Sequence, residues 1–446
     1  MHNRKRPIQF RDPIHGFIAV SPLELKIIDS PPFQRLRNIK QLATTYLVYP
    51  GAEHTRFGHS LGTMHLVTRA FESALQNYAV RNGEELFGSS VKAWYTQILR
   101  LIALTHDLGH APFSHASELL FEGGLEHEDF TKKIISETVV GDYIREIGQE
   151  FREEYGEQYD ITPELLWMIY GEKKPELNSD YKMPDYKFLK SFMDSELDCD
   201  KMDYLLRDSY YCGVNYGRFD LERLIGTLNV YVSLQDNVML LSIEHGGVSA
   251  FEEFVLARYF MFRQVYFHKT RRYLDLLLVD CLERILPKNK YPSDVEAYLQ
   301  LNDSVIYDQV KVASEGGDVS VCDFLERKVM TCVYETAPHH MSNSENALYS
   351  SVKKDIKRAG IKSKRDSAEK LAHKIPILDL YNHDSGKGIP VLLDNRERPS
   401  NLLEESPILR GLENPINLKR IYVRKEDAEK AKAIVNEVFR EDDDDE

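Results

Sequence analysis

The segment Leu104–His115 (LTHDLGHAPFSH) constrains this chain more than any other part of its sequence. It overlaps the end of Trp94–Leu104, where Ile98, Leu101 and Ile102 recur at the spacing of a buried helix face. After that helix come side chains that can bind a metal ion or transfer protons: His106, Asp107, His110 and His115. This order predicts an active site at the C-terminal end of a packed helix.

His106 and Asp107 offer an imidazole and a carboxylate, which suit a divalent ion that polarises oxygen better than a thiolate-bound structural zinc. A single His-Asp pair at a helix end is more often a partner of the helix dipole with a solvated carboxylate. Two other segments favour the metal site. Arg56–Gly62 begins a long helix with His59 in its first turn, and Asp198–Tyr204 begins another with three acidic residues. Helix-start N–H groups and a nearby cation would both keep such carboxylates ionised.

The order His59, His106, Asp107 and Asp200 resembles the metal-ligand set of the HD superfamily of metal-dependent phosphohydrolases. Longer motifs narrow the resemblance to deoxynucleoside triphosphate triphosphohydrolases, which include bacterial members and the vertebrate enzyme with a SAM domain and an HD domain. These motifs are Asp12–Gly16, Phe33–Arg37, Lys40–Leu42, Pro50–Ala52, His54–Phe57, Gly109–His115 and Asp200–Tyr204. The resemblance extends from about Ile8 to about Leu282 and thins beyond that point.

Composition limits the other classes of protein. The 446 residues are 42% hydrophobic, which is enough for a large core and at least one further unit. No apolar run approaches the ~20 residues that span a bilayer, so we expect a cytoplasmic protein without a membrane partner. The five cysteines never form Cys-x-x-Cys, which indicates reduced thiols. A net charge of −14 argues against nucleic acid as a partner.

Two charged segments stand outside these motifs. The basic run Lys353–Arg358 is continued by Lys362, Lys364 and Arg365, and such runs are most often solvated helix faces. The acidic segment Glu441–Glu446 is expected to be a disordered tail.

The sequence predicts a mainly α fold, with an HD-domain helical core, a short β-hairpin and a small C-terminal α/β unit. Helices are predicted at Pro22–Asp29, Pro32–Lys40, His59–Asn82, Trp94–Leu104, Glu126–Thr138, Thr162–Tyr170, Asp200–Tyr211 and, longest of all, Val248–Leu286. The hairpin is predicted from Leu228–Val232 and Val238–Ile243, around Gln235-Asp236-Asn237. Farther on we expect small helices in Tyr291–Met330, strands at Lys374–Tyr381, Gly388–Leu393 and Leu418–Val423, and a helix at Lys425–Val438. These predictions divide the chain into a catalytic core at 1–286, a C-terminal region at 287–440 and the tail at 441–446.

The resemblance implies roles for the residues of the active site. His59, His106, Asp107 and Asp200 would hold one divalent ion, with Mg, Mn, Fe and Zn left open. Such an ion lowers the pKa of its water towards ~7 and neutralises charge on phosphoryl oxygens. His115 is the first candidate for the general acid and His127 the second, whereas His110 would steady the phosphate. Each of these three could instead be a hydrogen-bonded core histidine.

Further residues are assigned to the substrate by the same resemblance. Arg56, Lys201, Arg258 and Lys269 would bind the triphosphate of a deoxynucleotide (dNTP), because four cations match its charge. The sugar would lie against Tyr204, Asp208 and Tyr266, with Gln41 and Leu42 near its 3′ side. Tyr204 and Tyr266 also suit ordinary core positions with wet hydroxyl groups.

The resemblance also implies an effector site between the subunits of a homotetramer. Asp29, Gln34, Arg37 and Arg223 would bind a dGTP-type nucleotide there, since an acidic acceptor can pair with the guanine N1–H and amino group. Asp29 could instead cap the break before Pro31, and Arg37 could pair with a neighbouring acid. Glu244 and Gly246 stand where the vertebrate enzyme has basic residues, so the effector would be bound differently.

The predicted function is metal-dependent hydrolysis of dNTPs to deoxynucleoside and triphosphate, activated by a dGTP-type effector. One alternative is another HD reaction, such as alarmone pyrophosphohydrolysis or phosphodiester cleavage. A second alternative is a non-enzymatic nucleotide sensor. Intact residues at all four ligand positions argue against the sensor, because a binding module has no reason to hold a reactive water.

Overall fold

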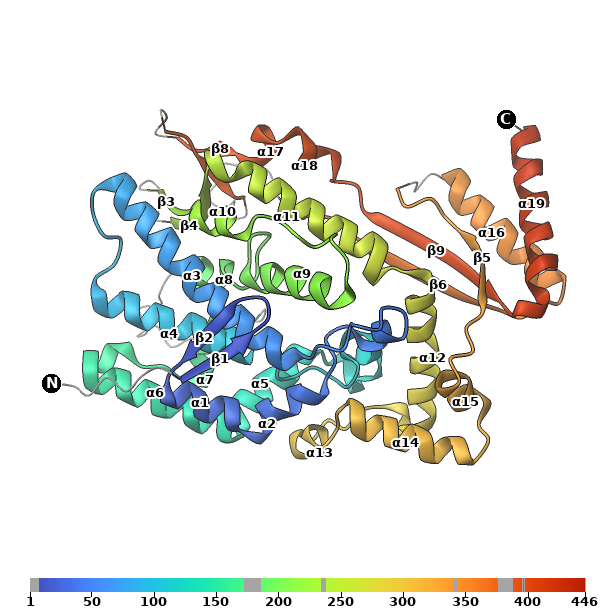
Figure 1. Cartoon of the computed structure of the whole chain (residues 1–446), viewed down its shortest axis with the longest axis horizontal. Coiled ribbons are helices and arrows are strands. Elements are labelled where there is room, and N and C mark those ends of the chain that lie inside the picture. Colours follow the sequence, from blue (N-terminus) through green and yellow to red (C-terminus); the bar gives the residue numbers. More distant parts are fainter. Residues whose placement is uncertain are drawn as a thin grey trace.

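The computed structural model describes residues 8–171, 186–233, 238–339, 343–375, 388–394, 396 and 398–445. Helices dominate the described chain, as the sequence predicted, and the strands form small sheets at its margins (Figure 1). At the N-terminus, β1 (Ile8–Asp12) and β2 (Gly16–Val20) form an antiparallel hairpin. No helix among the described residues is long and apolar enough to cross a membrane.

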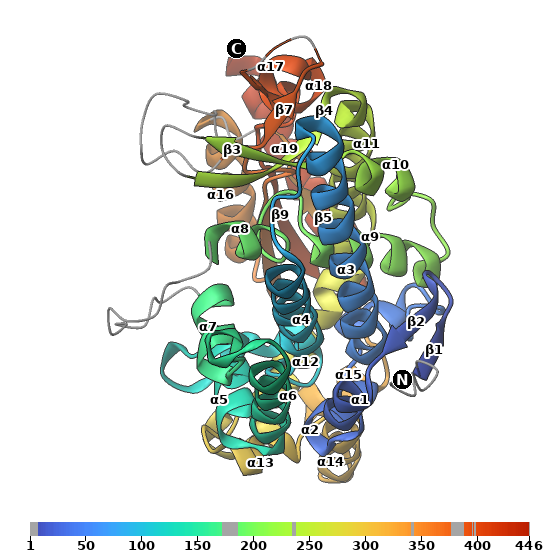
Figure 2. The ribbon, with the colours of Figure 1, turned by 90° about the vertical axis from the view of Figure 1, so that its left-hand side faces the viewer.

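Two long helices form the centre of the N-terminal part. Helix α3 (Arg56–Asn82) and helix α4 (Ser89–Thr105) lie side by side (Figure 2). As predicted, α3 ends at Gly83, which takes the left-handed conformation (φ 76°) that suits glycine after a helix. Helix α3 begins at Arg56 with His59 in its first turn, as the segment Arg56–Gly62 predicted, and therefore three residues before the predicted range His59–Asn82.

Shorter helices pack around this pair, and most of them were predicted. They are α1 (Pro22–Asp29), α2 (Pro31–Gln34), α5 (His127–Glu137), α6 (Val139–Tyr155), α7 (Pro163–Tyr170), α8 (Tyr186–Ser191), α9 (Cys199–Cys212) and α10 (Leu221–Gly226). The sequence specifies the start of α1 through a capping box, in which Ser21 accepts from the Glu24 amide and Glu24 accepts from the Ser21 amide. The predicted helix Pro32–Lys40 was wrong beyond Gln34, where the chain tightens into a 3-10 turn at Arg35–Asn38. A second 3-10 turn follows at Ala43–Leu47.

The longest predicted helix, Val248–Leu286, is broken in the structure. Helix α11 (Val248–Met261) passes into a π-helical turn at Phe262–Tyr266, and helix α12 (Lys269–Ile285) follows. The amide of Phe267 donates to the Phe262 carbonyl oxygen at 2.8 Å, five residues back, and His268 is non-helical (φ −56°, ψ 126°). The apolar pattern continues through the break, so periodicity alone could not predict it. Single π-helical turns of this kind occur frequently at functional sites.

The hairpin β3 (Leu228–Ser233) and β4 (Val238–Glu244) was predicted, although its turn lies outside the described residues. Its sheet continues into the C-terminal region. Strand β7 (Pro390–Leu392), predicted as Gly388–Leu393, pairs in parallel with β4 through Ile243 and Val391, and β8 (Ser400–Asn401) pairs with β7. Helices α17 (Leu402–Glu405) and α18 (Pro407–Gly411) follow. The division at residue 286 stays a prediction, but this sheet contains strands from both sides of it.

The C-terminal region contains the predicted small helices α13 (Val295–Leu299), α14 (Asp303–Glu315) and α15 (Val319–Leu325). Its second sheet has the order β5-β9-β6, from β5 (Thr331–Glu335), β6 (Ser363–Lys370) and β9 (Ile416–Val423). Helices α16 (Asn343–Arg358) and α19 (Ala428–Asp445) pack beside it and complete the predicted α/β unit (Figure 1). The sequence predicted β9 but neither β5 nor β6.

Two further predictions concern the C-terminal region. The strand predicted at Lys374–Tyr381 lies almost wholly outside the described residues. The prediction of a disordered acidic tail at Glu441–Glu446 was wrong, because helix α19 continues through Asp445. The final helix was otherwise predicted close to its place, with a 3-10 turn at Lys425–Asp427 before it.

Candidate active site

Three elements bring the predicted metal ligands together. His59 comes from the first turn of α3, His106 caps the end of α4, and Asp200 lies in the first turn of α9. His59 Nε2 is 2.9 Å from Asp200 Oδ1, and His106 Nε2 is 3.7 Å from the same oxygen. These three residues form a group that could hold a metal ion. Asp107 lies beside this group but outside it, with Oδ1 3.3 Å from His106 Nε2 and Oδ2 3.7 Å from His59 Nε2, and Arg56 binds its Oδ2 at 2.6 Å.

The orientation of both imidazoles suits a metal ion. His106 Nδ1 donates to the Ala103 carbonyl oxygen at 2.7 Å, and its buried Nε2 has no hydrogen-bond partner in the described part of the chain. His59 Nδ1 donates to Asp203 Oδ2 at 2.7 Å. A hydrogen bond at one ring nitrogen fixes the tautomer and leaves the other nitrogen for the metal. These donors therefore fit a divalent cation without rearrangement.

Asp203 is the centre of a buried network behind His59. It is 0% exposed and accepts hydrogen bonds from Arg207 at 2.8 and 2.9 Å, with His15 Nε2 2.6 Å away. Arg207 also donates to Asp12 at 2.8 Å. The motif Asp12–Gly16 therefore supports the metal group, meaning the predicted ligands His59, His106, Asp107 and Asp200, through Arg207 and Asp203. We did not assign Asp203 a role from the sequence. Its spacing of three residues from Asp200, on one face of a helix, is the signal that could have revealed it.

The electrostatics of the group favour a cation. Burial opposes a charged His59, but the hydrogen bonds to Asp200 and Asp203 and the charge of Asp107 raise its pKa to about 10. Burial also opposes ionisation of Asp107, but Arg56, His106 and His110 hold the pKa of that carboxyl well below its usual range. A metal ion would displace the proton of His59, since metal ligands must be deprotonated.

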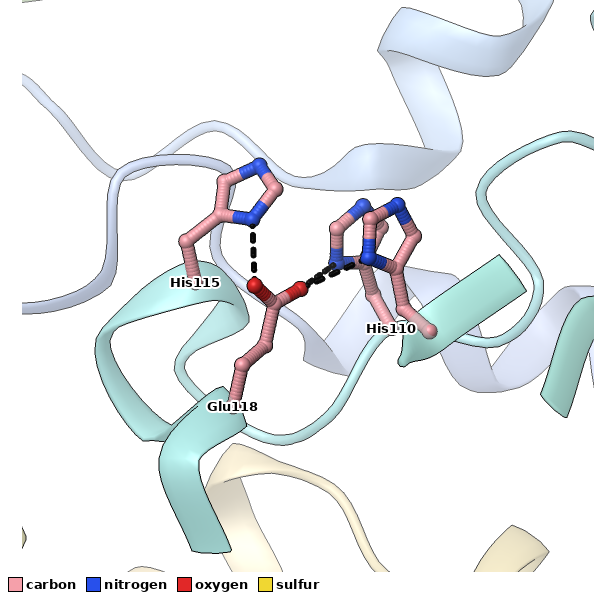
Figure 3. A group of neighbouring side chains, drawn as sticks. His110, His115 and Glu118 are labelled. Atoms are coloured by element: carbon pink, nitrogen blue, oxygen red, sulfur yellow. Dashed lines mark hydrogen bonds and ion pairs between the residues drawn. The ribbon is translucent and has the colours of Figure 1, made fainter. Parts of the chain in front are cut away.

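A second cluster lies beside the metal group and contains the three predicted catalytic histidines. Glu118 accepts from His115 Nδ1 at 2.9 Å through one oxygen, and its other oxygen is 2.8 Å from His127 Nδ1 and 3.4 Å from His110 Nδ1. Figure 3 shows the Glu118 carboxylate between His115 and His110. His110 stacks on His127 with ring centroids 3.8 Å apart and approaches Asp107 at 3.1 Å through Nε2. His110 therefore links the cluster to the metal group.

Glu118, like Asp203, is a residue of the candidate site that the sequence did not reveal. Burial raises the pKa of its carboxyl, but the hydrogen bond with His115 and the close approach of His110 and His127 outweigh burial and hold that pKa well below its usual range. The signal was its spacing of three residues from His115, which on a helix reads as an ordinary surface pair. His115 itself is 65% exposed in its side chain, so the nitrogen that Glu118 does not contact is free to meet a substrate.

Close contacts and hydrogen bonds constrain the backbone of the loop Gly109–Ser114, which lies between the two clusters. A Cβ on Gly109 would lie 1.9 Å from the His127 carbonyl oxygen, so only glycine allows this approach of α5. Phe113 and Ser114 take left-handed conformations (φ 61° and 53°), which cost of order 1–3 kcal/mol each in residues other than glycine. The Phe113 amide donates to Asp303 Oδ1 at 2.7 Å and stabilises this conformation.

Both clusters open into one cavity of about 1310 Å³. Most of the predicted substrate residues line it: Gln41, Leu42, Arg56, Lys201, Tyr204, Asp208, Arg258 and Tyr266. The Tyr266 hydroxyl donates to Asp208 at 2.6 Å, and Tyr204 meets Tyr266 edge to face. Arg56 lies in the cavity wall but pairs with Asp107 at 2.6 Å. Several buried atoms in this wall have no hydrogen-bond partner among the described residues: Gln41 Oε1, Arg258 Nε and Arg271 Nε. Such atoms indicate a polar ligand.

Lys269 is the predicted substrate residue that does not line the cavity. It is the first residue of α12, after the break in the predicted long helix, and its carbonyl oxygen accepts from the Tyr422 hydroxyl at 3.0 Å. The break instead places Arg271 and Arg272 in the cavity wall. Arg271 pairs with Asp275 at 3.2 Å and donates to the Tyr266 carbonyl oxygen at 2.7 Å.

None of the four predicted effector residues lines the cavity. Gln34 accepts from Arg37 Nε at 2.8 Å and donates to the Ile28 carbonyl oxygen, next to Asp29, at 2.7 Å. Arg37 also lies 3.5 Å from the centre of the Phe57 ring. Arg223 donates to the Gly246 carbonyl oxygen at 3.1 Å, and no contact among the described residues joins it to the other three. Within one chain, therefore, three of the four lie together.

Comparison with known proteins places this geometry in a family. The sequence model of the HD-associated region matches residues 219–446. The uncharacterized protein YwfO of Bacillus subtilis (strain 168) is 32% identical over 371 residues, which are 79% of this chain and 76% of YwfO. The chain belongs to the HD proteins that carry an HD-associated region.

The chain is also similar to proteins with solved structures or functional names. A hypothetical protein from Aquifex aeolicus is 32% identical, with a TM-score of 0.74, and the match covers 96% of this chain and all of that one. The deoxynucleoside triphosphate triphosphohydrolase SAMHD1 of Homo sapiens is 28% identical over 411 residues, which are 84% of this chain. The match spans 62% of the length of human SAMHD1.

Proposed function

We propose that this HD protein hydrolyses dNTPs to deoxynucleoside and triphosphate. The observation that carries the proposal is that one cavity joins a metal-binding group, a histidine cluster, a paired tyrosine and aspartate, and a set of cations. The likeness to SAMHD1, whose name states this reaction, supports it. Another HD reaction would not need Tyr204, Tyr266 and Asp208 beside the metal-binding residues, and a nucleotide sensor would not need the metal ligands.

His59, His106, Asp107 and Asp200 would hold the divalent ion, which would supply activation of water and neutralisation of charge on phosphoryl oxygens. Water attacks the α-phosphorus, and the bond from that phosphorus to the 5′ oxygen breaks. The leaving 5′ oxygen then needs a proton. Because Glu118 accepts a hydrogen bond from His115 Nδ1, Nε2 is the atom of His115 that donates this proton.

The cations and the tyrosines divide the substrate between them. Arg258 and Lys201 bind the phosphates, and both side chains are held in place, Arg258 by Glu196 at 2.9 Å and Lys201 by the Ser195 carbonyl oxygen at 2.9 Å. Tyr266, fixed by Asp208, packs against C2′ of the sugar and leaves no room for a ribose hydroxyl. Gln41 offers its unpaired Oε1 to the 3′ hydroxyl.

Product analysis tests the proposal. Purified protein is incubated with dGTP and Mn²⁺ or Mg²⁺, and the products are separated by ion exchange. Triphosphate with deoxyguanosine is expected. Release of pyrophosphate would favour another HD reaction, and tight binding without turnover would favour the sensor.

Two variants assign the roles within the site. His115→Ala should lower kcat by about 10²–10⁴ with little loss of nucleotide affinity, as for loss of a general acid. Asp200→Ala should remove both bound metal and turnover. His245→Ala serves as the control, because His245 is 59% exposed and outside the cavity lining. Unchanged metal content in Asp200→Ala would contradict the ligand set.

We further propose that the active form is a homotetramer activated by a dGTP-type effector near Asp29, Gln34 and Arg37, with Arg223 contributed across a subunit interface. An effector that favours the assembled state should make dGTP accelerate hydrolysis of dATP. The measurement is dATP hydrolysis with and without dGTP, in the wild type and in Asp29→Ala. Equal rates in all four cases would exclude an effector site, and stimulation that survives in Asp29→Ala would place the site elsewhere.

A further inference from the structure

Two lysines of the C-terminal region line the cavity and have no role in the function proposed above. Lys370 is the last residue of β6, and Lys374 follows four residues later. Both belong to the cavity wall, together with Lys201, Arg258 and Phe262. The HD-associated region therefore reaches the same cavity as the metal group.

The short segment that carries these lysines is held firmly. Ala372 is buried, and its carbonyl oxygen accepts from Arg258 Nη1 at 3.1 Å. His373, 3% exposed, lies 2.7 Å from the Leu409 carbonyl oxygen through Nε2. Anchors on two consecutive residues fix the backbone between Lys370 and Lys374. The lysines are therefore placed by the fold rather than carried on a free loop.

The charge at this end of the cavity is unbalanced. Both lysines are solvent-exposed, but partial desolvation, then the positive charges of Arg258, Lys374 and Lys201, lower the pKa of Lys370. The carboxylates of Glu196 and Asp198 already bind Arg258 and Lys201. Lys370 Nζ lies 5.6 Å from the centre of the Phe262 ring, and the Arg258 guanidinium lies 5.8 Å from the same ring. In the described ranges, neither Lys370 nor Lys374 has an ion-pair partner within 4 Å. Two lysines without ion pairs, beside two cations that are already paired, leave excess positive charge here, which favours an anionic ligand.

The ligand chemistry follows from the size and the charge of the cavity. Its volume of about 1310 Å³ exceeds the usual ~300–1,000 Å³ of small-molecule sites, so it accommodates an extended ligand. We propose that Lys370 and Lys374 bind the terminal phosphate of a linear polyphosphate, beyond the phosphates that Lys201 and Arg258 hold. That this polyphosphate is the triphosphate of a dNTP rests on the proposed function, whereas the polyphosphate subsite itself does not.

Direct binding of inorganic tripolyphosphate tests the subsite without catalysis. Calorimetry on the full chain compares the wild type with Lys370→Ala/Lys374→Ala. We expect the double variant to raise the Kd for tripolyphosphate about tenfold and to flatten its dependence on salt, because two phosphate contacts are lost. Lys370→Arg/Lys374→Arg should restore binding to within about threefold, which shows that charge rather than fold is responsible. Lys362→Ala, an exposed lysine outside the cavity lining, is the matched control and should bind like the wild type.

Kinetics separate this subsite from the proposed reaction. If dNTPs are substrates, the double variant should raise KM for dGTP with kcat within about threefold of the wild type, and deoxyguanosine should bind equally to both. If the wild type releases no triphosphate but its tripolyphosphate binding still depends on both lysines, the proposed reaction fails and the subsite stands. A tripolyphosphate Kd that is unchanged in the double variant, or absence of binding by the wild type, would overturn the subsite.

Discussion

Replacement of Asp203 by asparagine tests the residue that orients His59 without changing any of the proposed metal ligands. Asp203 is fully buried and touches no predicted ligand other than His59, at 2.7 Å, while it also accepts two hydrogen bonds from Arg207. The substitution keeps the shape of the side chain but removes its charge and replaces one acceptor oxygen by a donor. His59 then loses the acceptor that orients its ring, and Arg207 keeps only Asp12 as a charged partner.

The magnitudes follow from these contacts. Loss of a group that orients a metal ligand typically weakens metal binding by about 10–100-fold, or about 1.4–2.7 kcal/mol. Loss of one partner of a buried ion pair costs about 3–5 kcal/mol of stability. We therefore expect Asp203→Asn to lower metal affinity by at least tenfold and the free energy of unfolding by about 3 kcal/mol.

Asp12→Asn is the matched control. Asp12 accepts from the same Arg207 at 2.8 Å and does not contact His59, and its Oδ1, which accepts from the amides of Ile14 and His15, is kept in asparagine. The control should lose stability but keep metal affinity to within about threefold. Metal affinity is measured by competition with a chromophoric chelator, and stability by urea denaturation. Wild-type metal affinity in Asp203→Asn, or equal loss in both variants, would refute the orienting role.

Three further outcomes are expected. Glu118→Gln should lower kcat about tenfold or more without changing metal content, because His115 loses its carboxylate acceptor; an unchanged pH–rate profile would contradict this. Gly109→Ala should cost about 1–3 kcal/mol or more in urea denaturation, because its Cβ would meet backbone atoms, whereas Gly226→Ala, which has open space, should not. Burial, then His15 and Arg69, lower the pKa of His65 to about 4, so stability should fall as pH decreases from about 6.5 to about 4. That fall should be smaller in His65→Gln, and an identical pH dependence would exclude His65 as its source.

The sequence predicted that His59, His106 and Asp200 lie close together because each sits at a helix end that local patterns define; their role as metal ligands stays a prediction. His106 follows an apolar helix, His59 lies at the start of another, and Asp200 follows the capping residue Asp198, which accepts from the Lys201 amide at 2.8 Å. Local sequence signals predict helix ends to within a few residues. The resemblance of the motifs to the HD superfamily then predicted that these three ends lie near one another. The predicted helices His59–Asn82 and Asp200–Tyr211 are followed by Gly83 and Gly213, which end α3 and α9 in left-handed conformations.

Other features depend on contacts that no local pattern records. Strand β6 (SKRDSAEK) has no apolar alternation, yet Ala368 and Asp366 are buried because β9 and Arg272 meet them. Its prediction would have required the sheet partner, and so Lys370 was not recognised as part of the cavity wall. Glu118 was missed for a similar reason: its significance comes from His127, which is near in space but on another helix.

The order of the cavity wall along the chain has a consequence for synthesis. The proposed metal ligands end at Asp200 and the residues that support them end at Arg207, whereas β7, which pairs with β4, and the lysines of the HD-associated region come much later. N-terminal parts of a chain fold first as it leaves the ribosome. We therefore expect the growing chain to bind the proposed ion before the far wall of the cavity is complete. Chains that end before residue 360 should retain metal but bind tripolyphosphate at least tenfold more weakly than the full chain.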